Sequence, residues 1–206
     1  MRREACYSAR MTNGRSCLCS SAILALALLL ACCAPPRGSV TDITGVMPAL
    51  EFTMARANDG KLVNATDYRG KIVILYFGYT HCPDECPTTL ANLASVLKQL
   101  GQKATDVRVL FVSVDPERDT LPVLKSYVNV FAPEIDGLRG TPDAVAMLAR
   151  RYRVTYQVTP ASPGQAYEVM HSDSIFFFDA SGHARLVATS SDHTAVIAAD
   201  VERLMK

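Results

Sequence analysis

Cysteine is scarce in the globular part of this sequence. Of the seven cysteines in 206 residues, five lie within the first 33 positions, and only Cys82 and Cys86 lie beyond them. A disulfide-stapled scaffold needs several pairs, whereas a core of about 150 residues can fold without one. The sequence therefore excludes a disulfide framework and leaves one cysteine pair whose chemistry must be explained.

The sequence also lacks a basic excess. Four arginines and one glutamate lie in residues 1–33, and the rest of the chain has 17 basic and 19 acidic side chains. Nucleic-acid binding usually needs a basic face, so no nucleic-acid partner is expected. An internal repeat, a glycine-rich phosphate loop and a GxSxG elbow are absent from the sequence as well.

The apolar run near the N-terminus is too short to span a bilayer. Arginines precede SSAILALALLLA, and the run ends in LLAC, which resembles a bacterial lipobox with Cys32 as the lipidated residue. We expect a lipoprotein-type signal peptide (1–31), then Cys32 and a flexible tether (32–45), then one domain (46–206). The alternatives are an ordinary cleaved signal or a short uncleaved anchor, and Met11 is an equally good start. Each predicts export, and the lipobox predicts tethering to a membrane on the periplasmic side.

Alternating strand and helix patterns follow the tether. The expected elements are an N-terminal β-hairpin around Asn58-Asp59-Gly60, strands over 71–79 and 107–115, helices over 87–101, 119–131 and 141–154, a hairpin over 173–190 and a last helix from 193. Strands joined by helices pair in parallel, and the last hairpin adds antiparallel strands. The order predicts an α/β thioredoxin-like fold: a central mixed sheet flanked by helices, with an N-terminal β-hairpin extension.

The cysteine pair is expected at the start of a helix. With Pro87 at the first helical position, Cys86 becomes the N-cap, where the helix dipole favours a thiolate. Asp84 and Glu85 oppose that effect, so a strongly acidified thiol is not predicted. Three residues separate the cysteines, one more than in thioredoxin-like oxidoreductases, and this spacing allows either a metal clasp or a disulfide.

A histidine is the natural further ligand for such a pair. His171 precedes the strand SIFFF, in the loop that faces the cysteines in a thioredoxin-like fold. His81 adjoins Cys82, but its ring is expected to point away along the loop. His183 and His193 are expected on the surface. Two thiolates and one imidazole suit copper, and Cu(I) in particular, whereas zinc usually needs a fourth ligand and an iron–sulfur cluster needs more cysteines.

Three motifs resemble those of the Sco/SenC family of copper-binding proteins with a thioredoxin fold: FGYTHCPDECPTTL, VSVDPERDT and the late His171. The resemblance covers about residues 46–206. It implies copper, as Cu(I) or Cu(II), held by Cys82, Cys86 and His171. It also implies a metallochaperone, not an enzyme, that delivers copper to the CuA site of cytochrome c oxidase subunit II, with an upstream copper donor or thiol reductant as a further partner.

The same resemblance assigns Asp115 and Asp119 to metal transfer or partner contact. From the residues alone, a turn followed by an aspartate N-cap is an equal interpretation. Met170 stands where relatives often have an acidic residue, which excludes an oxygen ligand from that position, and Asp173 is a poor substitute. Met170 could supply a weak thioether ligand, but we expect it to serve in packing.

Two other functions use the same cysteines. A thiol–disulfide oxidoreductase that keeps the CuA cysteines reduced would need Cys82 and Cys86 but not His171. A copper or redox sensor would use the whole site without delivering metal. A peroxidase is less favoured, because the sequence offers no dedicated peroxidatic cysteine.

Overall fold

A central strand that is buried on both faces organises the fold. Strand β4 (Ile72–Gly78) is buried along its entire length, as its apolar and β-branched run predicts. The computed structural model describes residues 40–164 and 167–206. The predicted signal peptide (1–31), Cys32 and most of the predicted tether lie outside these residues.

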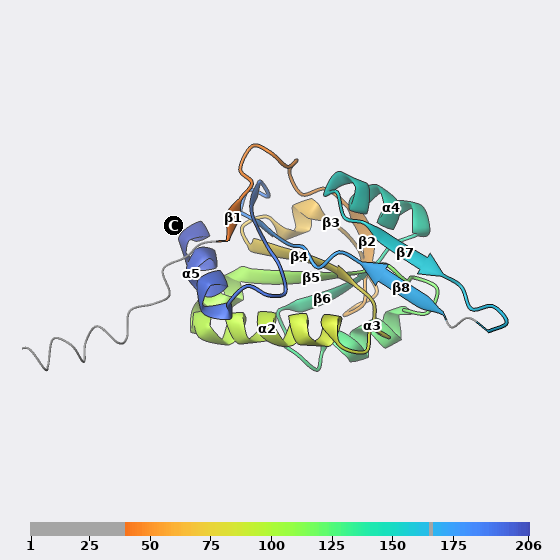
Figure 1. Ribbon diagram of the computed structural model, residues 1–206. Coiled ribbons are helices and arrows are strands. Elements are labelled where there is room, and N and C mark those ends of the chain that lie inside the picture. The colour runs from red at the N-terminus through yellow and green to blue at the C-terminus, as the bar shows by residue number, and fades with distance from the viewer. Residues whose placement is uncertain (1–39, 165–166) are drawn as a thin grey trace, which may run out of the picture. The chain divides into compact units, whose positions relative to one another are not determined.

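The described residues contain ten strands, four α-helices and two short 3-10 helices (Figure 1). In chain order they are β1 (Thr41–Asp42), β2 (Thr53–Arg56), β3 (Leu62–Asn64), η1 (Ala65–Tyr68), β4, α2 (Glu85–Leu100), η2 (Gly101–Asp106), β5 (Val107–Ser113), α3 (Leu121–Val128), β6 (Ile135–Arg139), α4 (Pro142–Arg151), β7 (Tyr156–Thr159), β8 (Glu168–His171), β9 (Ile175–Phe178), β10 (Ala184–Ala188) and α5 (Thr194–Leu204).

Eight of the strands form one mixed sheet in the order β1-β10-β9-β4-β5-β6-β2-β3. The β4–β5 and β5–β6 pairs are parallel, and the other pairs in this sheet are antiparallel. Helices α2, α3 and α5 lie on one side of the sheet and α4 on the other (Figure 1). This is the predicted mixed sheet flanked by helices, and the expected N-terminal hairpin is β2–β3.

Helix α2 packs through one apolar stripe. Leu90, Leu93, Leu97 and Leu100 recur at helical spacing and are all buried. The helix ends at Gly101, whose positive φ of 58° suits glycine. None of the helices in the described ranges combines the length and the apolar character needed to cross a bilayer.

The start of α2 differs from the prediction. The N-cap is Asp84, so Cys86 is the second residue of the helix and not its cap. The Thr88 amide already donates to the Asp84 carbonyl at 3.1 Å, which places the first helical turn two residues earlier. Proline is tolerated throughout a first turn because the N–H that it lacks would have no partner within the helix. The position of Pro87 was therefore not a reliable sign of where the helix begins.

Four short strands, β1, β6, β7 and β8, were not predicted. Residues 40–45 were assigned to the tether, but Val40 and Ile43 are buried and β1 pairs with β10, so the domain begins earlier than residue 46. Strand β6 contains Asp136 and Gly137, which disfavour strands in general. Strands β7 and β8 form a separate two-stranded sheet beside the main one.

Candidate metal centre

The cysteine-bearing loop begins at a glycine that leaves room for a sulfur atom. Gly78 ends β4, and a Cβ atom at this position would lie 2.5 Å from the Phe111 ring and 3.0 Å from Cys86 Sγ. Such distances are closer than side-chain contacts allow. Glycine at position 78 therefore lets the start of α2 bring Cys86 against the end of the central strand.

Cys82 and Cys86 are free thiols that face each other across the start of α2. The Cys86 amide donates to Cys82 Sγ at 3.3 Å, so a sulfur atom accepts from one of the amides that lack helical partners. Cys86 is completely buried, whereas Cys82 is partly exposed. The two sulfurs are thus close to each other but differ in their access to solvent.

His171 approaches the pair from the end of β8. Its Nε2 atom lies 3.1 Å from Cys86 Sγ, and its Nδ1 atom lies 3.0 Å from the carbonyl oxygen of Ser172. A carbonyl oxygen can only accept, so Nδ1 carries the proton and Nε2 presents a lone pair to Cys86. Orientation of a ligating imidazole by a backbone carbonyl on its other nitrogen is typical of metal sites.

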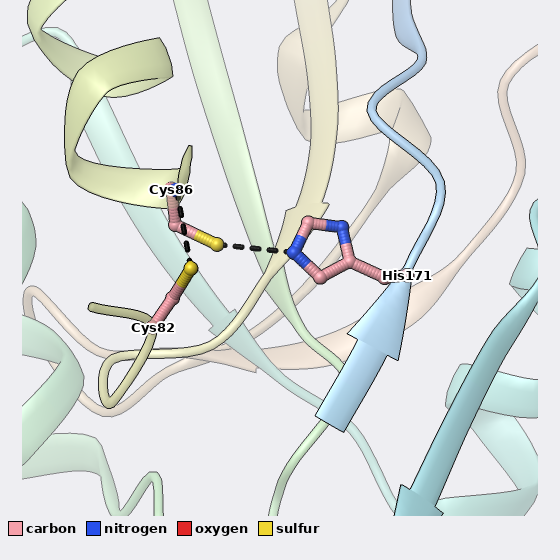
Figure 2. Close-up of side chains that lie close together, drawn as sticks. All are labelled: Cys82, Cys86 and His171. Carbon is pink, nitrogen blue, oxygen red and sulfur yellow. Dashed lines mark hydrogen bonds between the residues drawn. The ribbon is translucent and has the colours of Figure 1, made fainter. Parts of the chain in front are cut away.

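The three side chains form one cluster (Figure 2). Their sulfur and nitrogen atoms all lie within 4.8 Å of one another, and no other group of three or more such residues occurs in the described part of the chain. Two soft sulfurs and one imidazole fit copper, and three-coordinate Cu(I) in particular. A structural zinc site usually has a fourth protein donor, and the part of the chain that the structure describes adds no further cysteine, histidine or carboxylate to the cluster.

The pKa of the Cys86 thiol is raised to about 12, chiefly by burial and to a smaller extent by the neighbouring Cys82 sulfur. Desolvation disfavours a thiolate in this position. Cys86 is therefore a thiol at neutral pH, and its S–H donates to Nε2 of His171. For Cys86 this agrees with the expectation that the thiol is not strongly acidified. A metal that binds here must displace the proton of Cys86.

Two tyrosine rings enclose the imidazole. Tyr76 and Tyr79 both meet His171 edge-on, with ring centroids 6.0 and 5.9 Å away. The Tyr76 hydroxyl and the Thr89 hydroxyl are buried without a hydrogen-bond partner. Burial is the main cause that raises the pKa of Tyr76, so this hydroxyl stays protonated beside the cluster.

Asp115 and Asp119 are buried below the site. They are 1% and 0% exposed, respectively, so neither carboxylate lies on the molecular surface. Asp119 accepts hydrogen bonds from the cysteine loop, and Asp115 contacts Arg118 and Tyr167. Their assignment to transfer or partner contact stays a prediction, and the structure assigns them inward-facing contacts. Glu117 is the exposed acidic residue of this segment.

The remaining candidate ligands lie outside the cluster. The His81 ring is 52% exposed and turns towards Asp119, with Nδ1 3.7 Å from its carboxylate. His183 and His193 are exposed, as predicted. Met170 is 56% exposed, and since neighbours in a strand face opposite sides, it points away from the side of β8 that carries His171. The expected packing role of Met170 is therefore wrong.

Several residues that hold the site were missed in the sequence. Thr80, Ser113 and Tyr167 make side-chain hydrogen bonds to the two buried aspartates. The only signal for Thr80 was its place two residues before Cys82 in the motif, and Tyr167 lies outside all three motifs. The bonds of Thr80 and Tyr167 join segments that are 39 and 52 positions apart in the chain, so local patterns could not predict them.

Comparison with known proteins identifies the family. The family model described as SCO1/SenC matches residues 49–206. The chain belongs to the SCO1/SenC family. Its SCO1/SenC relatives include the mitochondrial SCO2 homologue of Bos taurus, 42% identical over 60% of this chain and 47% of that protein. The mitochondrial SCO1 homologue of Homo sapiens is 39% identical over 56% of this chain and 39% of that protein. The matched region thus spans less than half the length of these two relatives.

Solved SCO1/SenC structures share the fold. ScoI of Bradyrhizobium japonicum, solved with copper bound, is 36% identical with a TM-score of 0.69, covering 76% of this chain and 99% of that chain. Yeast Sco1, also solved with copper bound, is 31% identical with a TM-score of 0.69, covering 76% and 87%. The thioredoxin-like fold and the Sco/SenC resemblance are thereby confirmed.

Proposed function

We propose that this SCO1/SenC protein is a copper metallochaperone that binds copper through Cys82, Cys86 and His171. The observation that carries the proposal is the cluster itself: two sulfurs and one oriented imidazole nitrogen within 4.8 Å, contributed by segments 85 residues apart. Relatives solved with copper bound support the choice of metal. We further propose delivery to the CuA site of cytochrome c oxidase subunit II, which the family membership supports.

The chain's own residues prepare the site in a defined way. The Ser172 carbonyl keeps the lone pair of His171 on Nε2, and burial keeps Cys86 protonated until metal arrives. Uptake releases the proton of Cys86, so binding should strengthen as the pH rises. Release proceeds as exchange of Cys82, Cys86 and His171 for thiolate and imidazole ligands of the acceptor, without oxidation or reduction of the protein.

The proposed location follows from the predicted signal. A lipidated Cys32 would tether the domain to a membrane on the periplasmic side, near an oxidase subunit that is itself in a membrane. Tethering raises the effective concentration of one partner for the other. An upstream copper donor or thiol reductant would load the site or keep its cysteines reduced.

One comparison tests the copper site. The full chain, purified in detergent and reduced, is titrated with Cu(I) against a competing chelator, beside His171→Ala and the control His193→Ala. We expect the parent to bind one copper per chain and the control to bind it with the same affinity. In His171→Ala the affinity should fall at least about 100-fold, which is more than the loss of a residue that only contacts a metal ligand would cause. Equal affinity of His171→Ala and the parent would overturn the ligand set.

Delivery is tested separately. Copper-loaded parent is mixed with a soluble, reduced apo CuA domain, and the appearance of the CuA absorption bands is followed. Transfer from the parent but not from copper-loaded His171→Ala supports the chaperone function. If the parent binds copper but never transfers it, delivery is wrong and a sensor is favoured.

A thiol–disulfide oxidoreductase is the second candidate, favoured by the partial exposure of Cys82 next to a second free thiol. It predicts that His171→Ala still reduces a disulfide-linked peptide carrying the CuA cysteines, whereas Cys82→Ser does not. The chaperone function does not require this exchange. Absence of any exchange by the parent would exclude this candidate.

A further inference from the structure

We propose that residues 115–119 are a positioning brace, which sets the distance between the cysteine loop and His171. The inference rests on the proposed role of Cys82, Cys86 and His171 as ligands. The two ligand-bearing segments belong to different sheets, since the cysteine loop follows β4 and His171 ends the separate β7–β8 pair. The segment 115–119 makes side-chain contacts with both.

The Asp119 half of the brace holds the cysteine loop. Its Oδ2 atom accepts from the Thr80 amide at 3.1 Å and from the Ser113 hydroxyl at 2.6 Å, and its Oδ1 atom accepts from the Thr80 hydroxyl at 2.6 Å. The carboxylate is fully buried, so these bonds are shielded from water. Thr80 is two residues before Cys82, and the carboxylate thereby joins the loop to the end of β5.

The other half holds the strand that carries His171. The hydroxyl of Tyr167, directly before β8, donates to Asp115 Oδ1 at 2.8 Å. The Arg118 guanidinium pairs with the other oxygen of Asp115 and stacks over the Tyr167 ring, 3.7 Å from its centroid. Arg118 also lies 5.9 Å from the ring of Tyr79, which contacts His171 edge-on.

The two halves belong to one rigid turn. The Asp119 amide donates to the Asp115 carbonyl at 3.0 Å, and the Ser113 hydroxyl, which donates to Asp119, accepts from the Asp115 amide at 3.1 Å. The Val114 amide just before it donates to the Gly78 carbonyl at the start of the cysteine loop. Displacement of either half should therefore change the geometry of the three proposed ligands, which the brace reaches through Thr80 and Tyr167.

The test compares conservative variants of the full chain in the apo and copper-titrated states. Thr80→Val and Tyr167→Phe each remove one hydroxyl that donates to a carboxylate of the brace. Tyr68→Phe is the matched control, because the Tyr68 hydroxyl donates to another buried aspartate, Asp136, at 2.9 Å on the far part of the sheet. We expect Cu(I) affinity to fall about 10- to 100-fold in both brace variants and less than twofold in Tyr68→Phe.

Coupling to His171 separates positioning from general destabilisation. In a His171→Ala background, Tyr167→Phe should have no further effect on Cu(I) affinity, whereas Thr80→Val should keep its effect, because it acts through the cysteine loop. In the apo protein, NMR should show a weaker nuclear Overhauser contact between the Tyr79 and His171 rings in Tyr167→Phe but not in Tyr68→Phe.

The outcomes separate the brace from the proposed function. Affinities of Thr80→Val and Tyr167→Phe within twofold of the parent would overturn the brace while the copper site stands. Equal losses in Tyr68→Phe, or additive effects of Tyr167→Phe and His171→Ala, would also overturn it. If the parent itself binds no copper, the proposed function fails, and the ring contact in the apo protein alone decides the brace.

Discussion

The cysteine loop and the β7–β8 hairpin meet in one cluster, but they are held in different ways. The loop continues from the fully buried strand β4 into a 16-residue helix, and a buried carboxylate fixes its middle. The hairpin forms its own two-stranded sheet and contacts the site through side chains and rings. The sulfurs are thus positioned by the continuous backbone of the main sheet and helix together with one buried carboxylate. The imidazole is positioned by the Ser172 carbonyl, by two tyrosine rings and by the hydrogen bond from Tyr167 to Asp115.

Loss of a sulfur ligand should have the largest effect. Cys86→Ser removes a soft donor from the rigid side of the cluster, and we expect Cu(I) binding to become undetectable in a chelator competition. His171→Ala, on the hairpin side, should keep residual binding by two thiolates. If the serine variant binds Cu(I) more tightly than His171→Ala, the loop does not dominate the site.

The second largest effect should come from a side chain at position 78, where the cysteine loop begins. Gly78→Ala places a methyl group against Phe111 and Cys86 Sγ, so we expect a loss of about 1–3 kcal/mol in urea unfolding together with weaker Cu(I) binding. Gly137→Ala is the matched control, because its Cβ would meet Leu124 at 3.3 Å, away from the site. The control should keep its copper affinity whatever its change in stability.

The two thiols should differ in reactivity with pH. At pH 8 iodoacetamide should modify Cys82 and spare Cys86, whose pKa is raised to about 12 by burial. Mass spectrometry of the modified peptides measures both rates, and in urea the two should become similar. The contradictory result would be faster modification of Cys86 in the folded protein.

The raised pKa of Cys86 makes the stability of the metal-free protein depend on pH. The pKa of Cys86 lies above its ordinary value of 9.0, so the unfolded chain loses this proton first. The contribution of the buried thiol is complete below about pH 9 and is lost as the pH rises towards 12. Urea midpoints of the parent should therefore fall across this window, and those of Cys86→Ala should fall less.

Loss of His81 should have the smallest effect. The ring is half exposed and faces Asp119, so His81→Ala should change Cu(I) affinity less than twofold and stability by no more than about 0.5 kcal/mol. A tenfold loss of affinity would mean that His81 acts as a ligand. The hairpin residue His171 would then contribute less to Cu(I) affinity than its place in the cluster indicates.

The sequence predicted the three members of the cluster better than the residues that hold them in place. Cys82 and Cys86 lie in one local motif, and His171 was placed by the expected strand order, so all three followed from pattern and topology. The strand β6 was missed because Asp136 and Gly137 disfavour strands in isolation, and its place between β5 and β2 is a tertiary effect. The contact of Tyr167 with Asp115 spans 52 positions, and no local rule predicts such a pair.

In the proposed delivery, the complete burial of Cys86 would impose an order on the exchange of copper. The Cys86 sulfur lies against Gly78, the helix and the His171 ring, and it is not accessible to solvent. An incoming acceptor would replace the more accessible donors first, Cys82 and then His171. Cys86 would be the last donor to release the metal, at a point when the acceptor already holds it.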